Sequence, residues 1–99
     1  MASTAASITP VTIAVASGPS RAPVQLRDDG DFTIGRSAES LLSLDDAAVS
    51  RHHAKLSLRS GRLSITDLDS THGVWVNGVR LEPGEEAPMH DRDLVGIGP

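Results

Sequence analysis

The sequence predicts an all-β fold, a twisted antiparallel β-sandwich of about ten short strands. Short apolar runs rich in Val, Ile and Leu recur along the chain, with turn-forming residues between them at intervals of about 8–12 residues. Aromatic residues make up only 2% of the chain, so the core must be built from Val, Ile and Leu, which favour strands. A length of 99 residues allows one such domain.

The order of the expected elements follows from these runs. Residues 1–10 are small and polar and are expected to form a disordered N-terminal segment, which leaves 11–99 for the folded domain. The expected strands cover 11–16, 24–26, 32–34, 41–44, the two arms of a hairpin over 54–66, 74–76, 79–81, 87–89 and 94–97. For 38–49, a short helix is the competing interpretation.

Two turns define the expected hairpins. Asn77-Gly78 lies between two apolar runs and is the strongest short hairpin signal, because a type I′ turn needs positive φ at both central residues. Residues 59–62 form the other turn, where Gly61 is free to take positive φ. Alternation of leucines with polar residues over 54–66 predicts one buried face and one wet face.

The composition argues against several classes of function. The formal net charge of −4 argues against nonspecific nucleic-acid binding, which needs a broad basic face. No apolar run approaches the roughly 20 residues that span a bilayer, so no membrane association is expected. No Lys or Arg precedes Arg21, so a signal peptide is not expected either. The absence of cysteine excludes thiol chemistry and favours an intracellular protein.

Histidines and acidic residues do not form a metal or catalytic motif. His52 and His53 are adjacent and would point to opposite faces of a strand, so they are not expected to share a metal. Asp67, Ser70 and His72 are spaced as in a local turn, and the sequence has no nucleophile elbow. We therefore expect no metal, no cofactor and no enzyme activity.

Polar residues at the ends of the expected strands are suited to bind a phosphate group. Arg36 follows the run 32–34, Ser50 and Arg51 precede the hairpin, and Thr71 precedes the run 74–76. A phosphate group carries a charge of about −1.5 to −2 and three acceptor oxygens, which guanidinium and hydroxyl groups can satisfy. Because loops on a rigid scaffold commonly carry binding sites, we expect one phosphate pocket here.

Three blocks of sequence together resemble the forkhead-associated (FHA) domain. They are Gly35-Arg36, Ser50-Arg51-His52-His53, and the run 70–78, which reads Ser-Thr-His-Gly-Val-Trp-Val-Asn-Gly. The resemblance covers about residues 12–98. It implies a sandwich with its recognition loops at one end, and binding of phosphothreonine-containing partner proteins or peptides without catalysis.

The resemblance also implies a role for each matching residue. Residues implied to contact the phosphate are Arg36, Ser50, Arg51 and Thr71. Residues implied to support the site are Gly35, His53, Gly73, Asn77 and Gly78, with His53 bracing the loops from behind. The family's preference for phosphothreonine implies a small apolar dent that accepts the extra methyl group, whose burial is worth about 0.8 kcal/mol.

Two positions depart from the family pattern. His72 stands where the family usually has Asn, whose amide holds the peptide backbone. Imidazole can donate or accept a hydrogen bond, so a peptide-backbone contact is expected from His72. Ala48 occupies a position that selects acidic partners in some members, so an acidic preference is not expected from that position.

The resemblance implies a final strand that the sequence does not match. In the family that strand pairs with the first one, so residues 11–99 are expected to form a C-terminally truncated domain with an unpaired first strand. Pairing through that strand would give a homodimer. The alternative function is therefore an FHA-like structural or dimerisation module that does not depend on phosphate. Family tendency also predicts an intracellular, nuclear location.

Overall fold

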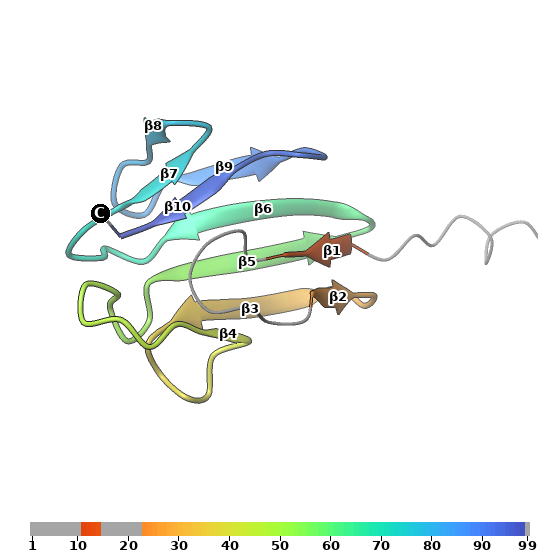
Figure 1. Ribbon diagram of the computed structural model, residues 1–99. Coiled ribbons are helices and arrows are strands. Elements are labelled where there is room, and N and C mark those ends of the chain that lie inside the picture. Colours follow the sequence, from red (N-terminus) through yellow and green to blue (C-terminus); the bar gives the residue numbers. More distant parts are fainter. Residues whose placement is uncertain (1–10, 15–22, 99) are drawn as a thin grey trace, which may run out of the picture.

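The computed structural model describes residues 11–14 and 23–98, and every regular element within these ranges is a strand (Figure 1). The strands are β1 (Val11–Ile13), β2 (Val24–Leu26), β3 (Gly30–Gly35), β4 (Leu42–Ser43), β5 (Ala54–Arg59), β6 (Arg62–Asp67), β7 (Val74–Val76), β8 (Val79–Arg80), β9 (Glu86–Met89) and β10 (Val95–Ile97). The predicted all-β class is confirmed, and 38–49 contains β4 and turns in place of the competing helix. The expected segment 1–10 lies outside the described residues.

A five-stranded sheet, with strand order β4-β3-β5-β6-β9, forms the larger layer of the fold. Two smaller sheets, β1-β2 and β10-β7-β8, pack against it through a shared core. In that core, Ile34, Leu56 and Ile65 from the large sheet cluster with Val74 of β7, and the partly buried Ile13 of β1 packs against them. The result is a sandwich-like arrangement whose interior is almost entirely aliphatic, as the scarcity of aromatic residues predicts.

The pairing of β4 differs from the antiparallel expectation, because β4 runs parallel to β3. After β3 the chain loops back, and the amide of Leu41 donates to the carbonyl of Thr33 (2.9 Å). The amide of Leu44 then donates to the carbonyl of Gly35 (2.8 Å). These loop bonds anchor a very short parallel pair, while the other strand pairs are antiparallel.

The first strand is not unpaired, and this corrects the sequence-based expectation. β1 pairs antiparallel with β2, with Val11 opposite Leu26 and Ile13 opposite Val24. The outer edges of the three sheets still lack a paired strand within the part of the chain that the structure describes. Among them are the second edge of β1 and the edge of β10 that faces away from β7.

Both predicted hairpins form with the expected turn geometry. The φ angles are 51° and 83° at Asn77 and Gly78, and 52° and 79° at Ser60 and Gly61. Positive φ at both central residues is the signature of a type I′ turn, whose twist matches that of the flanking strands. The expected solvent-exposed face of the 54–66 hairpin is not exposed at Ser57, whose exposed fraction is only 7%.

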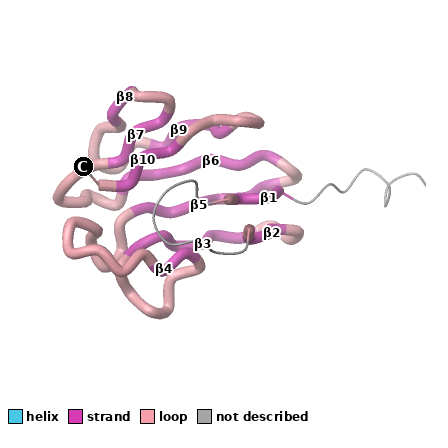
Figure 2. The backbone as a smooth tube through the Cα atoms, viewed as in Figure 1, coloured by secondary structure: helices cyan, strands magenta, loops and turns pink. Residues whose placement is uncertain are grey.

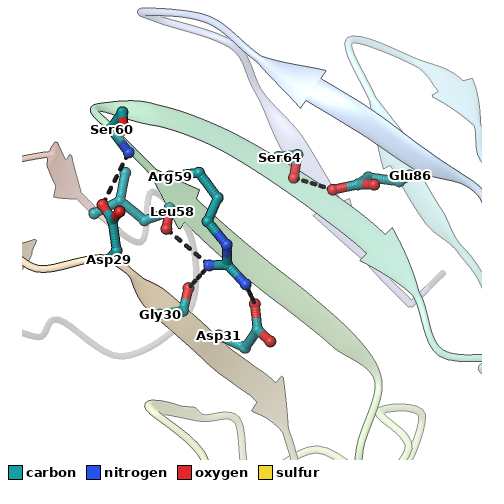
Figure 3. Close-up of polar contacts among 8 residues, drawn as sticks. All are labelled: Asp29, Gly30, Asp31, Leu58, Arg59, Ser60, Ser64 and Glu86. Atoms are coloured by element: carbon teal, nitrogen blue, oxygen red, sulfur yellow. Dashed lines mark hydrogen bonds and ion pairs between the residues drawn. The ribbon is translucent and has the colours of Figure 1, made fainter.

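Polar contacts join the strands near the Ser60 turn (Figure 3). The guanidinium of Arg59 donates to the carboxylate of Asp31 (2.9 Å), and the amide of Ser60 donates to the carboxylate of Asp29 (2.9 Å). Hydrogen bonds from Ser57 and then Arg59 hold the pKa of Asp31 below its usual value. Along the neighbouring pair, Ser64 of β6 donates to Glu86 of β9.

Strand register decides where the functional loops lie. Ile34, near the end of β3, is opposite Ala54 at the start of β5, and Ala54 is opposite Asp67 at the end of β6. The long connection 36–53 and the connection 68–73 therefore leave the large sheet at the same end (Figure 2). This end is opposite to the Ser60 turn, because β5 and β6 each run the length of the sheet between them.

Candidate functional site

The loop after β3 lies directly against the loop before β5. The amide of Arg36 donates to the carbonyl of Ser50 (2.9 Å), and the amide of Ser37 donates to the carbonyl of Arg51 (3.1 Å). Gly35 permits this approach, since a Cβ at that position would overlap the carbonyl oxygen of Arg51 and lie 2.9 Å from that of Ser50. The backbone positions of both arginines are therefore fixed by the same contact.

The loop between β6 and β7 joins the first two loops at Ser50. The amide of Thr71 donates to the hydroxyl oxygen of Ser50 at 3.2 Å. A hydroxyl that accepts one hydrogen bond still has its own proton to donate. Ser50 therefore meets both neighbouring loops, through its carbonyl to Arg36 and through its hydroxyl to Thr71.

A small hollow of about 130 Å³ opens where the three loops meet. Its lining residues are Arg36, Ala47, Ala48, Val49, Ser50, Thr71 and His72. The lining thus combines residues that carry a guanidinium, two hydroxyl groups and an imidazole with three aliphatic residues. The structure brings four of the predicted ligand-contacting residues to this one place: Arg36, Ser50, Thr71 and His72.

His53 ties the loops together from the interior. Its side chain is fully buried, Nδ1 accepts a hydrogen bond from the amide of Ser50 (3.0 Å), and Nε2 lies 2.7 Å from the carbonyl oxygen of Gly73. Because Nδ1 accepts, the ring proton is on Nε2, which donates to Gly73. One neutral imidazole therefore links the Ser50 loop to the Gly73 loop, and it does not line the hollow.

The connection 68–73 holds its shape through its own polar side chains. The carboxylate of Asp67 accepts from the amide of Ser70 (3.1 Å), and the hydroxyl of Ser70 accepts from the amide of Gly73 (3.0 Å). Gly73 has a φ of +92°, and a Cβ there would lie 2.6 Å from Nε of Arg80. Asp67 and Ser70 therefore stabilise a local turn, as their spacing in the sequence predicts.

Arg51 lies in a different hollow from Ser50 and Thr71. This second hollow has a volume of about 610 Å³ and is lined by Arg36, Ser37, Ala38, Glu39 and Arg51. Arg36 is the one residue that lines both hollows. The resemblance implied that Arg51 contacts the phosphate group together with Ser50 and Thr71. Sequence reasoning assigned no role to Ser37 or Glu39, which were marked only by their position just after Arg36.

Asn77 and Gly78 belong to the β7–β8 turn and line neither hollow. The side chain of Asn77 donates to Asp93 (3.0 Å) and accepts from the amide of Leu94 (2.9 Å). The hydrogen bond from Asn77, followed by one from the backbone of His90, lowers the pKa of Asp93. Asn77 therefore fixes the β7–β8 hairpin to the segment that leads into β10.

Within 11–14 and 23–98, no group of three or more His, Cys, Asp or Glu side chains is placed to hold a metal ion. No helix suited to crossing a membrane occurs in the same ranges.

Comparison with known proteins gives a consistent family match. The model of the FHA domain matches residues 32–98. The chain is 35% identical, over 87% of its length, to the oxoglutarate dehydrogenase inhibitor of Corynebacterium glutamicum. It is equally similar, at 35% identity and 87% coverage, to the glycogen accumulation regulator GarA of Mycolicibacterium smegmatis. It covers 58% of the first relative and 52% of the second, so it spans little more than half of their length.

Solved structures agree with this match. One FHA domain, from work on phosphothreonine-dependent FHA domain interactions, superposes with a TM-score of 0.79 at 32% identity, covering 91% of this chain and 88% of that one. EmbR of Mycobacterium tuberculosis, solved with a low-affinity phosphopeptide, gives a TM-score of 0.71 at 31% identity, covering 87% of this chain and 21% of that one.

The nuclear location expected from family tendency is not supported. The two relatives described above come from Corynebacterium glutamicum and Mycolicibacterium smegmatis, which are bacteria and have no nucleus.

Proposed function

Since the chain belongs to the FHA domain family, we propose that it is a phosphopeptide-recognition module that binds phosphothreonine-containing partner proteins through loops carrying Arg36, Ser50 and Thr71. One observation carries the proposal: three loops from distant parts of the sequence meet at a hollow of about 130 Å³ that these three residues line. A dianionic phosphate fits such a donor set, because the guanidinium and the hydroxyl groups are all hydrogen-bond donors.

The aliphatic residues of the hollow should favour phosphothreonine over phosphoserine. Ala47, Ala48 and Val49 lie beside the phosphate donors and can cover the methyl group of phosphothreonine. Burying one such group is worth about 0.8 kcal/mol, or roughly a fourfold gain in affinity. Ala48 adds no charge to the lining.

His72 and His53 have separate roles in this proposal. His72 lines the hollow and is exposed, so its imidazole can bond the backbone of the bound peptide. His53, with Gly35 and Gly73, keeps the loops in place and touches no ligand. Each role is one of binding or support, and the proposed activity includes no catalytic step.

The test is peptide binding by fluorescence polarisation with the full chain. We expect binding to a phosphothreonine peptide library that phosphatase treatment abolishes. Arg36→Ala should weaken this binding by about tenfold or more, since a charge-assisted hydrogen bond is worth roughly 1.5–3 kcal/mol. Arg62→Ala, at the exposed far turn, is the control and should leave the affinity unchanged. Binding that is indifferent to both phosphatase and Arg36→Ala would refute the proposal.

A dimerisation module is the second candidate, and one observation favours it. Within the described residues, β1 and β10 each have an edge without a paired strand, and such edges can pair with another chain. This candidate predicts a concentration-dependent dimer in sedimentation and no phosphate-dependent binding. The intracellular location stays a prediction.

A further inference from the structure

We propose that the larger hollow, beside the phosphate hollow, binds a second anionic side chain of the same partner peptide. This inference rests on the proposed function, because the first phosphate group must bring the peptide to the site. It adds a specificity for charge near the phosphothreonine, which Ala48 and its aliphatic neighbours cannot supply because they are uncharged.

The two arginines of the larger hollow are held next to each other by their backbones. The amide of Arg36 donates to the carbonyl of Ser50 (2.9 Å), and the amide of Ser37 donates to the carbonyl of Arg51 (3.1 Å). Gly35 allows these two loops to touch. The positions from which both guanidinium groups extend are therefore set before a ligand arrives. Such preorganisation lowers the entropy cost of binding.

Both guanidinium groups are available to a ligand. Arg36 and Arg51 are exposed, and neither side chain forms a hydrogen bond or ion pair with any residue of the described ranges. Arg59 and Arg80 contrast with them, because Arg59 is paired with Asp31 and Arg80 lies over the ring of Trp75 at 5.1 Å. Two unpaired forks on one hollow are suited to phosphate or carboxylate oxygens.

The other lining residues define the character of this subsite. The hydroxyl of Ser37 accepts from the amide of Glu39 (3.3 Å), which leaves its proton free to donate. Glu39 opposes an anion, and Arg36 is shared with the phosphothreonine, so Arg51 is the cation of this hollow that the first phosphate group leaves for a second anion. Removal of the Glu39 charge should therefore strengthen the attraction of Arg51 for that anion.

The larger hollow is separate from the smaller one. Its volume is about 610 Å³, compared with about 130 Å³, and it contains neither Ser50 nor Thr71 in its lining. Arg36 lies between the two hollows and lines both. A peptide with its phosphothreonine in the small hollow would thus place a nearby residue over Arg51.

The experiment compares phosphothreonine peptides that differ at one further position. Peptides carry Ala, Glu or phosphoserine at each of the three positions on either side of the phosphothreonine, and the full chain is titrated with each. At one or more positions, we expect Glu or phosphoserine to bind about three- to tenfold tighter than Ala. If Glu and phosphoserine both increase the affinity relative to Ala, an acidic side chain is a sufficient ligand. If phosphoserine alone increases it, the ligand is a second phosphate group.

Two charge variants assign the effect to the larger hollow. Arg51→Ala should bring the affinity ratio between the doubly and singly anionic peptides close to one, whereas Arg62→Ala should leave the ratio unchanged. Glu39→Gln should increase the ratio. Thermal melting of each variant checks that the fold is intact.

The outcomes separate this inference from the proposed function. If no phosphothreonine peptide binds, the proposed function fails. If the Ala peptides bind but Glu and phosphoserine add nothing at any position, the second subsite is refuted and the proposed function stands. A gain that survives Arg51→Ala also refutes the subsite.

Discussion

At the scale of single residues, His53 has the greatest structural influence on the site. It is fully buried, and its two ring nitrogens bond the amide of Ser50 and the carbonyl of Gly73. A substitution that removes the ring leaves both backbone groups without a partner in the interior, which is costly. The loops that carry Ser50 and Thr71 would then lose their shared support.

His53→Ala should therefore lower the free energy of unfolding by about 2–4 kcal/mol, measured by chemical denaturation. Phosphopeptide affinity should fall as well, because the Ser50 loop loses its interior anchor. His52→Ala is a matched control, since His52 is the adjacent residue and is exposed, and it should change stability by less than about 0.5 kcal/mol. Equal effects of the two substitutions would contradict the bridging role.

Sequence reasoning could identify the types of residue at the site, but not every neighbour. Arg36, Ser50 and Thr71 follow or precede apolar runs, so their loops could be predicted from the pattern. The separation of Arg51 from Ser50 could not, because adjacent residues differ in side-chain direction and only the loop path decides it. Ser37 and Glu39 were missed for the same reason.

At the scale of elements, Gly35 at the end of β3 is the contact on which two loops depend. A Cβ there would overlap the carbonyl oxygen of Arg51, a backbone atom that cannot move without displacing the loop. Gly96 in β10 offers a comparison, because a Cβ there would lie 3.6 Å from Cβ of Trp75, an ordinary contact distance. The two glycines therefore differ in how much room surrounds them.

Gly35→Ala should destabilise the domain by about 1–3 kcal/mol and separate the Arg36 and Arg51 loops. Phosphopeptide affinity is expected to fall further than stability alone would require, because the loop geometry changes in the folded state. Gly96→Ala should be tolerated in both measurements. Calorimetry and fluorescence polarisation on the two variants check this, and full binding by folded Gly35→Ala would contradict the account.

Elements with a strong local pattern were predictable and elements without one were not. The hairpins at Gly61 and Asn77-Gly78 were predicted because turn chemistry and strand alternation agree. The parallel pairing of β4 was missed because it covers two residues and depends on loop hydrogen bonds. Likewise, the pairing of β1 with β2 required knowledge of the path of the intervening chain.

At the scale of the whole molecule, the fold separates support from recognition. The five-stranded sheet holds the ends of β3, β5 and β6 in register, so that distant segments of sequence meet at one end. The Asp31–Arg59 pair and the Ser60 turn lie at the other end of the same strands (Figure 3). The core between the layers supports this geometry, and the proposed binding uses the loops.

The most direct test of the central claim is a titration of the ¹⁵N-labelled full chain with a phosphothreonine peptide, followed by amide chemical shifts. The account predicts that the amides of Arg36, Ser50, Thr71 and His72 shift together, that those of Ser60 and Gly61 stay in place, and that the dephosphorylated peptide causes no change. Shifts confined to the open edges of β1 and β10, or no shifts at all, would contradict it.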